Sequence, residues 1–137
     1  MKKTAPILAV AALALASCSG MQPMGRGASN CLQGSCTFTV TVSGCSASQI
    51  TVSQDPIWVD PAYRGPMHWE LNAPTGWKFA RPGIDIQGNS GEFDNLSHGA
   101  QKVTWNNNHR TVQPYKYNIV VEPPGGGTCH KDPTVMN

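Results

Sequence analysis

Short stretches of alternating apolar and polar residues are the feature that most restricts how this chain can fold. The clearest is residues 37–42, where Phe38, Val40 and Val42 alternate with threonines. A two-residue period places successive side chains on opposite faces of a β-strand. The pattern therefore predicts a strand whose apolar face is directed into a core.

The same signal recurs along the chain and indicates an all-β protein. No segment after residue 17 keeps a helical period over three turns, and glycine, proline and asparagine separate the short apolar runs. Strands spaced by roughly ten residues predict an antiparallel Greek-key sandwich of about seven to nine strands. The expected strands after 37–42 are 49–53, 57–59, 67–71, 84–86, 101–105 and 115–121. The residues expected to face inward include Met67, Trp69, Leu71, Val103, Trp105, Tyr115, Tyr117, Ile119 and Val121.

Residues 1–17 have the three parts of a secretory signal. Lys2 and Lys3 give the positive start, residues 7–16 form an uncharged apolar run, and Ser17 is the small residue at the cut. The run is shorter than the about 20 residues that span a bilayer. Because two of the 10 basic residues lie in this segment, against 8 acidic residues in total, the exported chain is nearly neutral. This balance argues against a nucleic-acid partner.

The end of the signal carries a second pattern. Leu15-Ala16-Ser17-Cys18 resembles the lipobox of bacterial lipoproteins at all four positions. The resemblance implies that the signal is cut before Cys18, that Cys18 receives a diacylglycerol, and that its new amine is acylated with a chain such as palmitate. Ser19, in place of aspartate, implies transfer to the outer membrane. Two or more acyl chains make such an attachment stable. The alternative is an ordinary signal peptide cut near Ala16.

These patterns predict three parts and a cell-envelope location. Residues 1–17 would be the lipoprotein signal peptide, residues 18–35 the lipidated N-terminus and a Gly-, Ser- and Pro-containing tether, and residues 36–137 the β-sandwich domain. The domain would lie in the periplasm or at the cell surface, attached to the membrane through Cys18.

Four cysteines remain once Cys18 is assigned to the lipid. An even number in an exported chain predicts two disulfides. Pairing Cys31 with Cys36 and Cys45 with Cys129 is favoured, although pairing Cys36 with Cys129 and Cys31 with Cys45 is nearly as reasonable. A zinc site is the functional alternative, but the Cys-x4-Cys-x8-Cys spacing lacks the usual paired ligands.

The order of strands from about Cys45 onward resembles the cupredoxin-like and immunoglobulin-like sandwiches of exported bacterial proteins. The residues that carry the resemblance are 49–53, 57–59, the tryptophan-bearing 67–71 and Tyr115-Lys116-Tyr117. The tail Asp132-Pro133-Thr134-Val135-Met136-Asn137 also resembles that of small proteobacterial lipoproteins of unassigned function. A shared fold does not carry a shared function with it.

Candidate metal ligands do not form a persuasive set. A blue-copper centre needs two imidazoles and a thiolate with a weak axial methionine, for which His109, Cys129, His130 and Met136 are the candidates. Cys129 and His130 are adjacent, so on a strand they would point to opposite faces. A looser copper or zinc site would draw on His98, His109 or His130. We expect no bound cofactor.

Neither an enzyme nor a glycan-binding site is strongly indicated. The carboxylates Glu70, Asp85, Glu92 and Asp94 show no spacing that selects an acid–base pair. Of the four tryptophans, Trp58, Trp69, Trp77 and Trp105, only Trp77 follows a turn in a way that suits a ligand surface; it would otherwise close the end of the sandwich beside Phe79.

The sequence thus predicts a non-catalytic structural or interaction module on a lipid anchor, with an unknown envelope protein or glycan as partner. The alternative is a lipoprotein that binds a metal or a glycan on the same scaffold.

Overall fold

The protein is described by a computed structural model that covers residue 31 and residues 36–137. The predicted signal peptide, Cys18 and all of the predicted tether except Cys31 lie outside the described residues. The described part consists of β-strands, turns and loops. It contains no helix long and apolar enough to cross a membrane. The strands are β1 (Cys36–Val42), β2 (Ile50–Val52), β3 (Ile57–Trp58), β4 (Gly65–Asn72), β5 (Lys78–Ile86), β6 (Phe93–His98), β7 (Lys102–Asn107), β8 (Pro114–Glu122), β9 (Cys129–Lys131) and β10 (Thr134–Met136).

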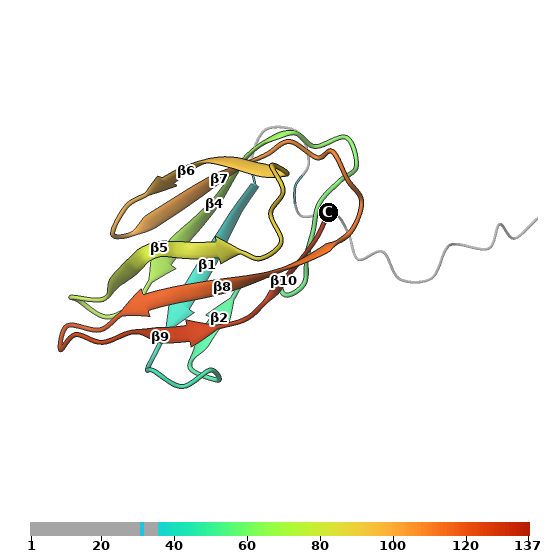
Figure 1. Ribbon diagram of the computed structural model, residues 1–137. Helices are drawn as coiled ribbons and strands as arrows, with labels where there is room; N and C mark the ends of the chain where they lie inside the picture. Colours follow the sequence, from blue (N-terminus) through green and yellow to red (C-terminus); the bar gives the residue numbers. More distant parts are fainter. Residues whose placement is uncertain (1–30, 32–35) are drawn as a thin grey trace, which may run out of the picture.

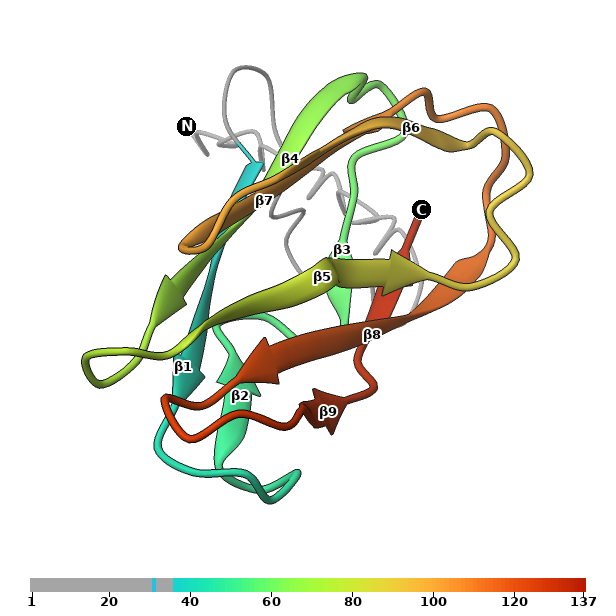
Figure 2. The ribbon, with the colours of Figure 1, turned by 60° about the vertical axis from the view of Figure 1, so that its left-hand side comes forward.

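Two five-stranded sheets pack face to face as a sandwich (Figures 1 and 2). The first has the order β2-β1-β4-β7-β6. The second has the order β3-β10-β8-β5, and β9 also pairs with β8. The predicted all-β sandwich is therefore confirmed at the level of its layers.

The expectation of purely antiparallel pairing is wrong at two places. β1 and β4 run parallel, with Cys36 opposite Met67 and Val40 opposite Leu71. β3 and β10 also run parallel, with Ile57 opposite Val135. The reason is the path of the chain: after β2 it crosses to the second sheet for β3 and then returns to the free edge of β1. Alternation within a strand reports which face is buried and carries no information on the direction of the neighbouring strand.

β5 differs from expectation because it continues through a segment that reads as a loop. Phe79 pairs with Val121 and Ile84 with Ile119, and the register shifts between these pairs. Gly83 lies in this irregular stretch at φ +83°, and a Cβ atom there would lie 2.6 Å from Cγ2 of Val103. Glycine at this position therefore lets one strand bend closely over the opposite sheet.

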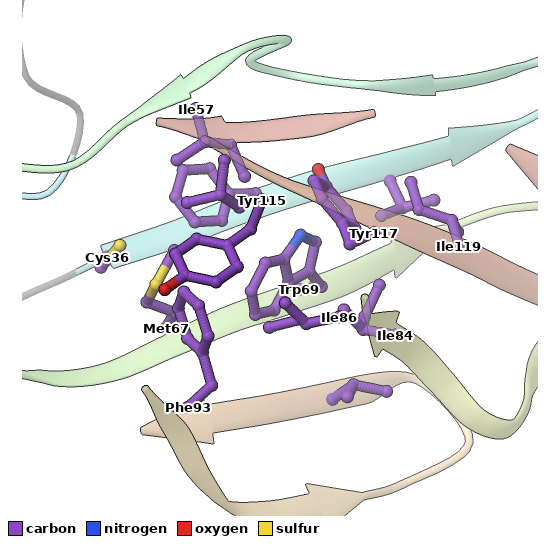
Figure 3. Close-up of a cluster of buried hydrophobic side chains, with 14 of the residues drawn as sticks. Cys36, Ile57, Met67, Trp69, Ile84, Ile86, Phe93, Tyr115, Tyr117 and Ile119 are labelled. Carbon is purple, nitrogen blue, oxygen red and sulfur yellow. The ribbon is translucent and has the colours of Figure 1, made fainter. Parts of the chain in front are cut away.

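The core lies between the sheets and is centred on Trp69 (Figure 3). Trp69 is 0% exposed on β4. Its ring centroid is 5.5 Å from that of Phe38 on the neighbouring strand and 5.7 Å from that of Tyr117 on the opposite sheet. Phe93 and Tyr115 form a second contact between the sheets, edge to face at 5.2 Å. Buried aromatic residues of this kind contribute a large share of the hydrophobic stabilisation of a small domain.

The inward faces agree with the alternation in the sequence. Phe38, Val40 and Val42 are buried on β1, and Tyr115, Tyr117, Ile119 and Val121 are buried on β8. Leu71 and Trp105 are partly buried and pack against the same core. β6, β9 and β10 had no clear sequence signal, because a bulge interrupts β6 and the other two are three residues long.

Both disulfides have the favoured pairing, which is confirmed. Cys31 bonds to Cys36, and Cys45 bonds to Cys129 across a separation of 84 residues. The second disulfide joins the loop that follows β1 in one sheet to the start of β9 in the other. It therefore closes the sandwich covalently at that end.

The two disulfides should differ in their contribution to stability. Replacing Cys45 and Cys129 by serine removes a long cross-link, whereas replacing Cys31 and Cys36 removes one with a separation of 5 residues. The chain-entropy relation predicts a loss in the free energy of unfolding of about 4 to 5 kcal/mol for the long loop and about 2 kcal/mol for the short one. Urea denaturation of the two double variants without reductant measures both values. Equal losses would contradict this account.

Candidate functional site

One end of the sandwich is closed by segments that are far apart in the sequence. Cys31 forms an isolated parallel bridge with Val59, and its carbonyl accepts a hydrogen bond from the Asp60 amide at 3.4 Å. The Val59 amide in turn donates to the Met136 carbonyl at 2.9 Å. In Figure 1 the C-terminus lies beside the loop before β4 and the segment before β8. We call this region the Cys31 end.

A buried polar cluster occupies the Cys31 end. It consists of Glu92, Asn107, His109 and Asn137, which are only 2%, 0%, 4% and 6% exposed. The Asn137 carboxamide lies at its centre. Its Nδ2 donates to Oε1 of Glu92 and to the Thr111 carbonyl, and its Oδ1 accepts from Nδ2 of Asn107 at 2.6 Å. Buried polar groups are tolerated when they are paired in this way.

Glu92 anchors the segment between β7 and β8. Its Oε1 accepts hydrogen bonds from the amides of Arg110 at 2.7 Å and Thr111 at 3.3 Å, in addition to Asn137. Its backbone carbonyl accepts from the Asn108 amide at 2.8 Å. Backbone amides thus compensate the carboxylate for its lost hydration. Glu92 thus holds residues 108–111 against the end of the sandwich through both its side chain and its backbone carbonyl.

His109 is the member of the cluster with incomplete hydrogen bonding. Its backbone is held on both sides, because its amide donates to Oδ1 of Asn107 at 2.8 Å and its carbonyl accepts from Nη2 of Arg64 at 3.0 Å. Both imidazole nitrogens are buried without a hydrogen-bond partner. Its φ of 44° lies in the left-handed region, which is uncommon for histidine. The imidazole is therefore held in place by its backbone and by packing.

The surroundings of His109 favour the neutral imidazole. Burial lowers the pKa of His109 below its ordinary value, and the nearby Arg64 guanidinium lowers it further. The carboxylates of Glu92 and Asp60 act in the opposite direction with smaller effect. Glu92 already accepts three hydrogen bonds and forms none with the imidazole, so it does not provide a direct partner for a charged ring.

The predicted metal ligands are not brought together. Cys129 is in a disulfide and His109 lies in the polar cluster, while His130 is exposed and shares a hydrogen bond with Thr128 at 3.2 Å. Met136 is on β10, and His98 is on β6. Over residue 31 and residues 36–137, no three histidine, cysteine, aspartate or glutamate side chains gather in an arrangement that could hold a metal ion.

The four carboxylates that were candidates for acid–base chemistry occupy separate environments. Glu92 belongs to the buried polar cluster, and Glu70 forms a surface ion pair with Lys102 at 3.1 Å. Hydrogen bonds from Asn108 and Asn106 lower the pKa of the Asp94 carboxyl. Asp85 is exposed on β5. Glu92, Glu70 and Asp94 thus each stabilise the structure around them.

Trp77 is half-buried immediately before β5 and packs against the core. Its carbonyl accepts a hydrogen bond from Nε2 of Gln101 at 2.8 Å. Trp69 is fully buried and Trp105 donates from Nε1 to the Ile84 carbonyl at 2.9 Å, so both serve the sandwich itself. A ligand surface at Trp77 stays a prediction, and its packing agrees with the expected closure of the sandwich end.

Sequence reasoning did not identify the polar cluster as a unit. It singled out Glu92 as a candidate acid and His109 as a candidate ligand, while Asn137 was noted only as part of a tail. No local pattern marked the cluster, because its members lie apart in the chain and Glu92, Asn107 and Asn137 belong to residue types that are usually exposed.

Comparison with known proteins adds no relative: the chain matches no protein-family model and no curated protein.

Asn137 should be important for stability because it bridges the cluster. Replacing Asn137 by alanine leaves buried polar atoms of Glu92 and Asn107 without their shared partner. We expect the free energy of unfolding to fall by about 2 to 3 kcal/mol. Urea denaturation measures this change. Asn72→Ala is the matched control, because Asn72 is exposed at the end of β4 and should change stability by less than about 0.5 kcal/mol. Equal effects of the two substitutions would disprove the role assigned to the cluster.

Proposed function

We propose that this protein is a lipid-anchored protein of the bacterial cell envelope, and that its β-sandwich acts as a non-catalytic structural or interaction module. The lipid would be on Cys18, most simply in the outer membrane, with the sandwich in the periplasm or at the cell surface. The partner would be another envelope component, either a protein or a glycan.

The distribution of the cysteines is the observation that supports this proposal best. The chain has 5 cysteines, and the four that follow Cys18 form two disulfides with one another. Cys18 therefore has no cysteine of its own chain left to pair with. A single thiol that follows Leu15-Ala16-Ser17 has the position that the lipobox resemblance requires.

The two disulfides are also consistent with an exported location. Disulfides persist in oxidising compartments such as the bacterial periplasm and are rare in the cytosol. Both disulfides are integral to this fold, because Cys31, Cys36 and Cys129 are buried in the core cluster. An export signal and a disulfide-containing domain support the same compartment.

The partners of the carboxylates support a non-catalytic role. Glu70, Glu92 and Asp94 are bonded to Lys102, to the polar cluster and to asparagine side chains, respectively. A catalytic acid–base pair needs two carboxyl groups that flank a common substrate position. These three carboxylates have different neighbours and stabilise three different parts of the fold.

We also propose that the sandwich belongs to the Greek-key type seen in cupredoxin-like and immunoglobulin-like domains. The support is the path of the chain, which crosses between the two sheets after β2, β3, β4, β5 and β7. Such crossing connections distinguish a Greek-key sandwich from two separate meanders.

Lipid attachment can be tested directly at Cys18. In a bacterial host supplied with a fatty-acid probe, the full chain should take up the label and sediment with membranes, and Cys18→Ser should lose the label because the acceptor sulfur is absent. Mass spectrometry of the purified protein should place the first residue at Cys18 with its acyl groups.

The Cys31→Ser, Cys36→Ser double variant is the matched control for replacement of cysteines elsewhere in the chain, and it should keep the label. An unlabelled wild-type protein, or a mature form without acyl groups that begins at another residue, would refute the anchor.

A further inference from the structure

We propose that the buried polar cluster is an acid-sensitive latch, in which protonation of His109 releases the residue 108–113 segment and Asn137 from the Cys31 end of the sandwich. This inference concerns the folded domain and does not depend on the lipid anchor.

The first part of the argument is the position of the imidazole. His109 is 4% exposed, and neither ring nitrogen has a hydrogen-bond partner. A neutral imidazole in this position leaves one donor and one acceptor unpaired, whereas an imidazolium leaves two donors and a positive charge unpaired. Acid therefore acts on a group that, as a cation, would have no hydrogen-bond acceptor for either ring N–H in the closed structure.

The charged groups around His109 compensate such a cation only in part, because the effect of the Glu92 and Asp60 carboxylates is smaller than that of burial and Arg64. Arg64, from the loop before β4, bonds to the His109 carbonyl and brings a second positive charge close to the ring. Asp60 comes from the same loop, and its Oδ1 accepts from the Ala62 amide at 2.8 Å. Glu92 comes from the segment before β6 and uses Oε1 for Arg110, Thr111 and Asn137. Arg110, the next residue in the chain, is a further positive group.

The second part of the argument is the connection between His109 and the rest of the Cys31 end. The His109 amide bonds to Oδ1 of Asn107, whose Nδ2 bonds to Asn137. The backbone amide of Asn137 donates to the Gln113 carbonyl at 3.2 Å. The bond from Arg64 to the His109 carbonyl joins the loop before β4 to the segment between β7 and β8. Displacement of residue 109 therefore breaks its bonds to Asn107 and Arg64 directly, and it reaches Asn137 through Asn107.

The direction of the pH effect follows from linkage. Burial and Arg64 hold the pKa of His109 in the closed state below that of an exposed histidine, which is about 6.5. The open state, in which residue 109 has left the Cys31 end and its ring is exposed, therefore binds the proton more readily. The closed state is favoured in full above about pH 6.5, and this preference is lost as the pH falls below that value.

Hydrogen exchange at peptide resolution tests the latch in the full chain. After correction for the chemical rate, amides of residues 108–113 and of Asn137 should exchange faster at pH 5 than at pH 7.5, by up to about thirtyfold. The upper limit follows from the pKa of an exposed histidine, about 6.5. This value lies about 1.5 pH units above pH 5 and therefore corresponds to a factor of about 30. Amides of β1, β4 and β8 near Trp69 should not change. Uniform acceleration, or none, would overturn the proposal.

His109→Asn is the informative variant because asparagine tolerates the left-handed backbone and does not titrate in this range. It should lose the acid response in residues 108–113, whatever its exchange rate at pH 7.5. His98→Asn is the matched control, since His98 also has a buried unpartnered ring nitrogen but lies on β6 near Lys102, toward the opposite end. The His98→Asn variant should keep the acid response of residues 108–113.

An NMR titration of the wild-type protein provides a second measurement that does not need the variant to fold. The His109 ring resonance should titrate with a midpoint below about 6.5, the ordinary value for an exposed histidine. The amide resonances of residues 110–113 should shift with the His109 midpoint. A His109 midpoint at or above about 6.5 would refute the proposal.

Discussion

The contact of Trp69 with both sheets is the interaction on which the rest of this structure depends. Its indole is fully buried between Phe38 beside it and Tyr117 across from it. Neither the Trp69 N–H nor the Tyr117 hydroxyl makes a hydrogen bond of good geometry. Burial raises the pKa of Tyr117, with the neighbouring indole N–H acting weakly in the opposite direction. Packing of large rings, and not polar pairing, therefore holds the two layers together at their centre.

The core was predictable because it depends on a local pattern. Alternation alone identified the buried faces of β1, β4 and β8. The predicted export signal and an even number of cysteines predicted two disulfides but left two pairings open. The parallel pairing of β1 with β4 was not predictable, because it depends on where the chain goes between them. Nor was the continuation of β5 through Arg81-Pro82-Gly83, since proline and glycine usually end a strand and here allow it to bend.

The buried polar cluster shows the limit of reading residues one at a time. Glu92, Asn107 and Asn137 are separated by long stretches of chain, and each belongs to a residue type that is usually exposed. Only the three-dimensional path brings them together, and only then does the partial hydrogen bonding of His109 become visible. Hydrogen-bond networks of this kind have no sequence period, so no pattern search would assemble them.

The double attachment of Cys31 has a mechanical consequence. Its disulfide to Cys36 leads into the first sheet, while its bridge to Val59 leads into the second. Tension applied to the chain before residue 31 would be divided between a covalent link to one layer and hydrogen bonds along the other. The two layers would then bear the load together, and a pull from that side would not peel a single edge strand away from the domain.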